Sequence, residues 1–437
     1  MNERIRSHFT RTLCASDYAY LNISTALLMM KSLIYIMLNN TQTLNAIRKF
    51  ADDKPAVILG IETSCDDTGC GIVDTTGKIL SESINSQHLI HLNNGGIIPT
   101  FASDLHREYI TTVCEDALKL ANLRLRDIDA IATTTRPGLF LSLAVGNNFG
   151  KYLSRIGNKP YIPIHHMEAH ALTVRMVQKV DFPFLVLLVS GGHSLLAIVE
   201  NVDKFYILGT TLDNPPGEIL DKIARRLKLA NISEFSHMSG GQAIESAASK
   251  ATDPTKFAFM PILTKHRDCQ FSFSSLLSNS FKYINKQINF DINGSTEISE
   301  VYNLCAAVQL CLVKHICLRT QRAMEFINNE NLIPQERRTL VISGGVACNN
   351  FLAKALEIVC SKRGFNFVRT PPRLCNDNGV MIAWNGAEKW MANVGIMRDR
   401  KEIEKITVDK DAPFGESWVE RVQAANIKCR LVKLDFE

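Results

Sequence analysis

Two histidines spaced four residues apart are the first side chains in this sequence that point to chemistry. They are His166 and His170, in the run of residues 165–170. On a helix, residues four apart lie one turn apart on the same face, so both imidazoles can bind a single metal ion. Such a site needs a third ligand, and Asp377 is the best candidate. Asp377 lies between a predicted turn and a predicted helix, where an aspartate can instead cap the helix or form an Asx turn.

The histidine pair resembles the zinc helix of a metalloprotease, but its glutamate is misplaced. In the protease motif the glutamate directly follows the first histidine. Here Glu168 is two residues after His166, which is about 200° around a helix of 3.6 residues per turn. This placement disfavours a metalloprotease, which we keep as an alternative.

Glycine-rich turns form the second group of interest, because each follows a predicted apolar strand. Glycine lets backbone amides approach an anionic ligand closely, although any one glycine pair can also form a plain turn. Several such turns together favour a nucleotide cleft. No Gly-x-Gly-x-x-Gly or Gly-Lys-Ser/Thr motif follows a predicted strand, which excludes Rossmann and P-loop sites. The turns are Ser190-Gly191-Gly192, Ser343-Gly344-Gly345 and Gly240-Gly241, together with the acidic turn Asp66-Asp67.

Asp221 is a candidate for contact with a ribose. Its carboxylate, within residues 213–222, can accept hydrogen bonds from two ribose hydroxyls. The alternative is that this stretch is only the start of an exposed amphipathic helix, capped near Gly217.

The elements that would position these groups alternate between strands and helices. Residues 57–73 predict a strand, a polar turn and a second strand, and residues 184–199 repeat this pattern. Two related halves of an α/β protein with mixed sheets follow from this alternation. Further strands are predicted at 130–134, 161–164, 339–342 and 365–368, and helices at 106–122, 142–156, 218–229, 300–328, 350–363 and 378–394.

Length and composition set the organisation of the chain. The 437 residues suffice for two lobes plus tails, and 46% hydrophobic with 21% charged residues is typical of a globular protein. We expect lobes at residues 53–180 and 181–395 and an accessory tail at 396–437. The twelve cysteines include no Cys-x-x-Cys pair, which indicates a reducing compartment without a disulfide framework or a four-thiolate zinc site.

The N-terminal segment differs in charge from the rest. Residues 1–51 hold six basic and two acidic side chains, which leaves 43 basic and 42 acidic residues in the remainder. Residues 1–52 therefore predict a mitochondrial transit peptide or a disordered extension. The apolar stretch 21–38 is too interrupted for a confident membrane span. Because the body is nearly neutral, a nucleic acid would need local patches such as Arg225/Arg226/Lys228 or Lys314/Arg319/Arg322, which can also be solvated helix faces.

Seven motifs occur in a set order between residues 56 and 394. They are Ile-Glu-Thr-Ser-Cys-Asp-Asp-Thr (61–68), His-Met-Glu-Ala-His (166–170), Leu-Leu-Val-Ser-Gly-Gly-His-Ser (187–194), Gly-Glu-Ile-Leu-Asp-Lys (217–222), Phe-Ser-Phe-Ser (271–274), Ser-Gly-Gly-Val-Ala-Cys-Asn (343–349) and Cys-Asn-Asp-Asn-Gly (375–379). Any one of the motifs is modest, whereas the ordered set is highly specific. The set closely resembles one family, the TsaD-type tRNA N6-adenosine threonylcarbamoyltransferases, once called glycoproteases, in their mitochondrial form.

The resemblance implies an actin- and hexokinase-like fold, with two lobes around a nucleotide cleft. It implies transfer of a threonylcarbamoyl group from threonylcarbamoyl-AMP to the exocyclic amine of the adenosine 3′ of the anticodon, in mitochondrial tRNAs reading codons that begin with A. By position in the motifs, the metal ligands would be His166, His170 and Asp377, and Asp66 and Asp67 would lie at the reacting centre. The adenylate would contact Leu188, Val189, Ser190, Gly191 and Gly192, the ribose would contact Asp221, and the adenosine would lie near Gly241, Glu245 and Asn349.

The resemblance also implies a cofactor, partners and a location. We expect one divalent metal ion, zinc or iron, a separate synthase that makes threonylcarbamoyl-AMP, a homodimer in the mitochondrial matrix, and no membrane insertion. A kinase or chaperone of the same fold and a non-catalytic nucleotide-binding scaffold remain alternatives. The chain departs from the usual family pattern at Thr100, Asp104, Arg136, Ser275 and Asn376, which puts contacts with tRNA or partner subunits in doubt.

Overall fold

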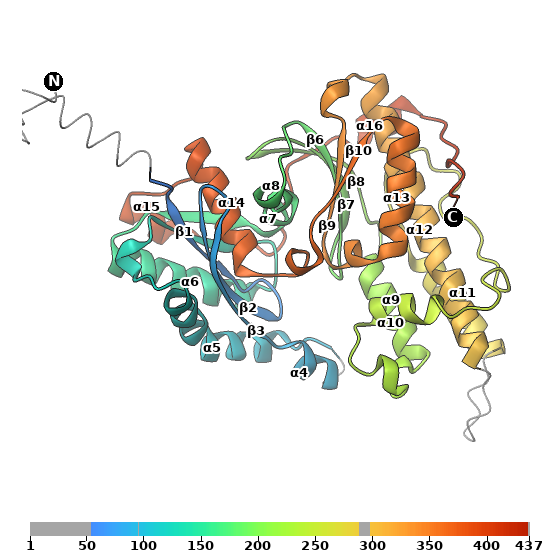
Figure 1. The fold of residues 1–437 in the computed structure, drawn as a ribbon, viewed down its shortest axis with the longest axis horizontal. Coiled ribbons are helices and arrows are strands. Elements are labelled where there is room, and N and C mark those ends of the chain that lie inside the picture. The colour runs from blue at the N-terminus through green and yellow to red at the C-terminus, as the bar shows by residue number, and fades with distance from the viewer. Residues whose placement is uncertain (1–53, 95, 288–297, 436–437) are drawn as a thin grey trace, which may run out of the picture. The chain divides into compact units, whose positions relative to one another are not determined.

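The computed structural model describes residues 54–94, 96–287 and 298–435. The predicted transit peptide or extension at 1–52 lies outside these residues. The described chain from Ala56 onward forms one compact unit built on two mixed β-sheets (Figure 1).

The first sheet has the order β3-β2-β1-β4-β5. Strand β1 is antiparallel to β2 and parallel to β4, β2 is antiparallel to β3, and β4 is parallel to β5. The strands are β1 (Val57–Glu62), β2 (Asp67–Asp74), β3 (Ile79–Ser86), β4 (Ala130–Arg136) and β5 (Tyr161–His165).

The second sheet has the order β10-β9-β6-β7-β8-β11. Its strands β8-β7-β6-β9-β10 repeat the arrangement of the first sheet, and β11 is an additional edge strand. Strand β6 corresponds to β1, because it is antiparallel to β7 and parallel to β9. This shared order confirms the prediction of two related halves in an α/β protein with mixed sheets, as an actin- and hexokinase-like fold requires. The strands are β6 (Phe184–Val189), β7 (Ser194–Asn201), β8 (Lys204–Thr210), β9 (Thr339–Ser343), β10 (Asn366–Arg369) and β11 (Glu416–Ser417).

Strand β1 is apolar from Val57 to Ile61 because both faces of the first sheet are covered. Leu59 packs in a core with helices α5 (Pro99–Leu120) and α6 (Phe140–Gly157). Ile58 points to the opposite face and packs with α14 (Gly379–Ala392). Successive strand residues face opposite sides, so β1 reads as a continuous apolar run. Helix α5 begins seven residues before our prediction, because Pro99 is a favourable first residue of a helix.

Glycines bring α14 unusually close to the first sheet. A Cβ at Gly60 would lie 2.2 Å from the backbone nitrogen of Ala383, and one at Gly71 would lie 2.4 Å from that of Val380. This contact fixes the start of α14, and therefore the turn that carries Asp377, against β1 and β2. The closing helix of the predicted second lobe thus packs on the first sheet.

The second sheet is also covered on both faces, one of them by residues 167–180. One core combines β6 to β9 with helices that lie together in the chain's second half. Among the described residues, α12 alone is long and apolar enough to cross a membrane, and most of its apolar stretch is buried inside the protein. The helices are α9 (Pro216–Arg226), α10 (Gly240–Ala248), α11 (Ser274–Gln287), α12 (Ile298–Asn329) and α13 (Asn350–Arg363).

The C-terminal segment contacts both sheets. Helix α15 (Arg400–Lys405) places Ile403 in the first sheet's core, while α16 (Val419–Ala425) places Val422 in the second sheet's core. The predicted limits at residues 180 and 395 remain a prediction. The remaining short helices are α4 (His88–Asn93), α7 (His166–Leu172), α8 (Val174–Val177) and the 3₁₀ turns Leu125–Asp127, Leu229–Asn231, Ser233–Phe235, Gln335–Arg337, Gly345–Cys348 and Pro372–Leu374.

Candidate metal and nucleotide site

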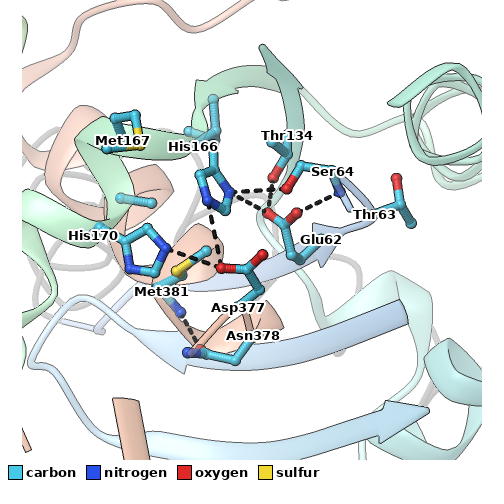
Figure 2. Close-up of polar contacts among 12 residues, drawn as sticks. Glu62, Thr63, Ser64, Thr134, His166, Met167, His170, Asp377, Asn378 and Met381 are labelled. Atoms are coloured by element: carbon cyan, nitrogen blue, oxygen red, sulfur yellow. Dashed lines mark hydrogen bonds and ion pairs between the residues drawn. The ribbon is translucent and has the colours of Figure 1, made fainter. Parts of the chain in front are cut away.

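The structure brings His166, His170 and Asp377 together. The two histidines lie one turn apart on α7, directly after β5, with ring centroids 4.7 Å apart. Oδ1 of Asp377 lies 3.1 Å from Nε2 of His170 and 3.5 Å from Nε2 of His166 (Figure 2). One potential ligand atom from each residue lies within 4.8 Å of the others.

These separations suit a metal ion. Ligands about 2.1 Å from a tetrahedral zinc ion lie roughly 3.4 Å apart. Two imidazole nitrogens and a carboxylate oxygen are also a donor set that zinc and iron both accept. Both histidine side chains are almost fully buried, so few water molecules compete for these nitrogens. The three residues therefore fit one divalent ion, with room for further ligands from a substrate.

A buried carboxylate, which our sequence analysis assigned no role, lies on the other side of His166. Oε2 of Glu62 lies 3.4 Å from Nδ1 of His166, and Oγ of Ser64 lies 3.1 Å from the same nitrogen. Glu62 is 0% exposed. The backbone amide of Ser64 and the hydroxyl of Thr134 both donate to Glu62, each at 2.5 Å. An acidic residue at the end of an otherwise apolar strand was the available signal.

The charges around His166 oppose the effect of its burial. Burial lowers the pKa of His166, but the carboxylates of Asp377 and Glu62 outweigh that effect and raise it to about 9. The pKa of Asp377 is held well below its usual range by the two histidines, against its own burial. Without a metal ion, His166 is therefore cationic at neutral pH, and a metal would replace its Nε2 proton.

His193 is a further histidine near these groups. It lies in the turn between β6 and β7, and its pKa is lowered to about 4 by burial and by the neighbouring His166 and His170. His193 is therefore neutral at pH 7. His193 belongs to the motif at 187–194, but its role was not predicted, because its proximity to α7 depends on tertiary packing.

The acidic turn at the start of β2 also lies within electrostatic range of this centre. Burial raises the pKa of Asp67 to about 7, against a hydrogen bond from Ser86, and nearby Asp66, Asp377 and Glu62 raise it further. Oδ1 of Asp67 is buried and has no hydrogen-bond partner among the described residues. Asp66 is half-buried beside it. Asp67 therefore offers an acceptor oxygen without a partner and a carboxyl that titrates near neutral pH.

The Ser190–Gly192 turn after β6 lies next to the histidine centre and next to the start of α9. Leu188 and Val189 are buried in the cores on opposite faces of β6, so only their backbone can contact a ligand. Gly191 and Gly192 are exposed, and a Cβ on either would meet no atom of the described residues within 4 Å, apart from its chain neighbours. The hydroxyl of Ser190 accepts hydrogen bonds from the amides of Gly192 and His193. The turn therefore presents exposed backbone beside the histidines.

Helix α9 starts against the same turn. A Cβ at Gly217, the second residue of α9, would lie 2.8 Å from Gly191. One helical turn later, the exposed Asp221 accepts hydrogen bonds from the backbone amides of Gly240 and Gly241. Desolvation nonetheless raises the pKa of Asp221. Its exposed carboxylate can still accept hydrogen bonds from a ligand.

Gly241 and Asn349 lie on the wall of a small, mostly apolar cavity of about 10 Å³. Asn349 caps α13, since its Oδ1 accepts from the amide of Leu352, and it donates to Gln309. Glu245 accepts from the amide of Asn350 at 2.7 Å. The remaining lining residues are Leu220, Ile244, Gln309, Leu312, Val313, Val346 and Leu352.

One of the two basic patches considered for nucleic acid is not on the surface. Arg319 and Arg322 are 0% and 4% exposed. Arg319 donates to the backbone carbonyls of His266, Asp268 and Leu263. The hypothesis of a surface patch at Lys314/Arg319/Arg322 is therefore wrong, because two of its members hold a loop inside the protein.

Glu168 pairs with a lysine of a neighbouring helix and has no place in the histidine centre. Its carboxylate forms an ion pair with Nζ of Lys389 on α14, at 2.9 Å, and both side chains are largely buried. It does not share the hydrogen bonds of the histidine centre. This arrangement agrees with the helical geometry that disfavours a metalloprotease.

The comparisons with known proteins give a consistent result. The family model described as "TsaD: tRNA N6-adenosine threonylcarbamoyltransferase" matches residues 78–384. The mitochondrial tRNA N6-adenosine threonylcarbamoyltransferase of Danio rerio is 45% identical over 87% of this chain and 94% of its own length. The human protein of the same name is 46% identical, over 87% of this chain and 91% of its own length.

A bacterial relative and a solved structure extend the comparison. The tRNA N6-adenosine threonylcarbamoyltransferase of Rhizobium johnstonii is 39% identical over 76% of this chain and 88% of its own length. The crystal structure of HypF from T. kodakarensis aligns with a TM-score of 0.47 and 14% identity, over 77% of this chain and 48% of that one. From the family model and the sequence relatives, the chain belongs to the tRNA N6-adenosine threonylcarbamoyltransferase family.

Proposed function

We propose that this protein transfers the threonylcarbamoyl group of threonylcarbamoyl-AMP to the exocyclic amine of the adenosine 3′ of the anticodon, in mitochondrial tRNAs that read codons beginning with A. The observation that carries this proposal is the position of the Ser190–Gly192 turn. It lies between the histidine centre, through His193, and α9, through Gly217. An activated AMP ester bound along this turn would have its reactive end at the histidines and its nucleoside at α9 and α10.

Each part of the adenylate has a group that suits it. The exposed backbone at Gly191 and Gly192 suits the phosphate, because no other atom of the described residues lies close to either glycine's open side. The carboxylate of Asp221 suits the ribose hydroxyls. The apolar side chains around Gly241 and Asn349 suit the faces of an adenine ring, which would bind against their surface near Glu245.

His166, His170 and Asp377 would hold one divalent ion, zinc or iron, which acts as a Lewis acid toward oxygens of the substrate. An acyl adenylate is already activated, so no side-chain nucleophile is needed. The attacking amine of the tRNA must lose a proton. Asp67 is the best candidate to accept it, because its pKa of about 7 allows proton uptake at neutral pH. Asp66 is the second carboxylate of that turn.

The setting of the reaction follows from the relatives' names. The vertebrate relatives are named mitochondrial, and residues 1–52 have the charge pattern of a transit peptide. We place the protein in the mitochondrial matrix, where a separate synthase would supply threonylcarbamoyl-AMP. Import of a reporter fused to residues 1–52, and its loss when the basic residues of that segment are replaced, tests this placement.

A homodimer is the proposed assembly. Several large apolar side chains are exposed close together in the chain, between β3 and the first turns of α5, and such patches often mark protein interfaces. A charged Phe101→Glu variant should be monomeric by light scattering where the wild-type protein is a dimer. The exposed side chains are Leu89, Ile90, Ile97, Ile98 and Phe101.

Reconstitution tests the reaction itself. Purified full-length protein, loaded with zinc or iron, is incubated with threonylcarbamoyl-AMP and an unmodified mitochondrial tRNA transcript that reads an A-starting codon. The expected product is threonylcarbamoyladenosine at the position 3′ of the anticodon. Transfer to no tRNA under any metal loading would contradict the proposal and favour a nucleotide-binding scaffold, whereas metal-dependent peptide cleavage would favour a metalloprotease.

A further inference from the structure

Glu62 is a buried acidic side chain that the fold alone does not require. It ends the apolar strand β1, where an aliphatic residue would extend the core on one face of the sheet. Burying a carboxylate is costly unless donors surround it. The described donors are the amide of Ser64, the hydroxyl of Thr134 and the ring of His166. Two of these three come from elements that lie more than seventy residues away in the chain.

The two nitrogens of His166 face opposite groups. Nδ1 faces Glu62 and Ser64, and Nε2 faces Asp377 (Figure 2). A neutral imidazole holds one proton, so a nitrogen that binds a metal must leave that proton on the other nitrogen. An ionised carboxylate can only accept hydrogen bonds. A carboxylate beside Nδ1 therefore favours the form in which Nδ1 carries the proton and Nε2 has a free lone pair.

We propose that Glu62 is a positioning residue, which holds the Nδ1 proton of His166 and so directs the Nε2 lone pair of that ring toward a metal shared with Asp377 and His170. Ser64 does not fix the form of the ring, because a hydroxyl can either donate to or accept from Nδ1. Thr134 and the amide of Ser64 fix the carboxylate itself. This inference rests on the proposed metal centre and adds the residue that orients one of its ligands.

Glu62→Gln separates charge from shape. The glutamine keeps the size of the side chain, and its oxygen can still accept from the amide of Ser64. Its NH2 group would then face Nδ1 and donate to it, which leaves the proton on Nε2, where it blocks a metal. Outer partners of this kind affect metal affinity by about 10- to 100-fold.

The experiment uses full-length protein stripped of metal with a chelator and titrated with Zn²⁺ alone, in competition with a metal indicator. We expect Glu62→Gln to bind Zn²⁺ about 10- to 100-fold more weakly than the wild type. Ser64→Ala is the matched control and should bind within about threefold, since it keeps the carboxylate beside Nδ1. Equal affinity for Glu62→Gln and the wild type would overturn the inference, and so would an equal loss in Ser64→Ala.

A second measurement needs no variant of Glu62 and covers the case in which that variant does not fold. In zinc-loaded wild-type protein labelled with ¹⁵N-histidine, the ring nitrogens of His166 report which one carries the proton. We expect a protonated Nδ1, with the resonance assigned by its loss in His166→Ala. An unprotonated Nδ1 would overturn the inference. Failure of the wild-type protein to bind any Zn²⁺ would instead contradict the proposed metal centre.

Discussion

Oδ1 of Asp377 lies 3.1 Å from Nε2 of His170, although 207 residues separate the two in the chain. The contact exists because α14 packs against the glycines of β1 and β2, while α7 follows β5 of the same sheet. The sheet thereby holds both sides of the candidate metal centre.

Loss of a ligand should remove both metal and activity. We expect His170→Ala to lose most bound metal and to slow tRNA modification by at least about 100-fold, because ligand loss should exceed the effect of losing an outer partner. Elemental analysis and the modification rate measure the two effects. His237→Ala, at an exposed histidine, is the control and should match the wild type. Full activity of His170→Ala without metal would contradict a catalytic metal.

The acidic turn should impose a pH dependence on the rate. Because the pKa of Asp67 is raised to about 7, its carboxylate forms as the pH rises through 7. If it accepts the amine proton, the rate should rise over that range, and Asp67→Asn should be slower by about 100-fold or more, with a flatter profile. Rates measured from pH 5.5 to 8.5 with saturating substrates test this. An undiminished rate in Asp67→Asn would refute the role.

Ionisation of Asp67, which should raise the rate as the pH rises, should lower the stability of the folded protein over the same range. A carboxyl whose pKa is higher in the folded state favours folding most at low pH, and this contribution is lost as the pH rises through the folded pKa. The Asp67→Asn protein should therefore be more stable than the wild type at pH 8, by a margin that shrinks toward pH 4. Urea unfolding of the metal-free proteins measures this margin. Asp203→Asn, at an exposed site, should show no such trend.

Two glycines in the candidate nucleotide turns should respond differently to alanine. The new methyl group of Gly191→Ala would meet no atom of the described residues within 4 Å, apart from its chain neighbours. The free energy of unfolding should therefore stay within about 0.5 kcal/mol of the wild-type value. The same methyl group would occupy the space proposed for the adenylate and raise the KM for threonylcarbamoyl-AMP about tenfold or more. Gly344→Ala should destabilise the protein by about 1–3 kcal/mol, because Gly344 has φ +98° and its Cβ would lie 2.5 Å from the carbonyl oxygen of Val189.

Steady-state kinetics and urea unfolding of both glycine variants separate these effects. An unchanged KM in Gly191→Ala would argue against adenylate binding at that turn. A stable Gly344→Ala protein would show that the turn after β9 relaxes more easily than its backbone geometry suggests.

Arg319 should matter for stability and not for tRNA affinity. It is buried and donates to three carbonyls and to Asp268, and breaking a buried charge pair costs about 3–5 kcal/mol. Arg319→Ala should therefore lower the unfolding free energy by several kcal/mol, whereas Lys314→Ala, at an exposed residue of the same helix, should change it little. A loss of tRNA affinity in a folded Arg319→Ala protein would revive the surface-patch hypothesis.

Part of the metal centre and the two-sheet repeat could be predicted from the sequence, and the physical reason differs from one residue to another. His166 and His170 are predictable because their helical spacing is local. Asp377 was the best candidate for the third ligand, but an Asx turn or helix cap stayed equally open, since no local rule links residues two hundred positions apart; the order of the family's motifs favoured the ligand role. The repeat was visible because β1 and β6 begin the two halves with the same strand and turn pattern. Helix boundaries were less accurate where a proline began the helix, as at Pro99.

Other features depended on packing that sequence patterns do not contain. Glu62 follows an apolar run and reads as the first residue of a polar turn, although it lies inside the sheet. Arg319 reads as part of a basic surface, although α12 is buried around most of its circumference. A charge within a helix that is apolar on nearly all sides was the signal that could have predicted its burial.

Nucleoside analysis of mitochondrial tRNA tests the central claim most directly. Cells that lack this protein are complemented with the wild-type chain, with His166→Ala or with His237→Ala, and threonylcarbamoyladenosine is measured by mass spectrometry in tRNAs that read A-starting codons. We predict that the modified nucleoside is lost without the protein, restored by the wild-type chain and by His237→Ala, and absent with His166→Ala. Unchanged threonylcarbamoyladenosine in cells that lack the protein would contradict the account.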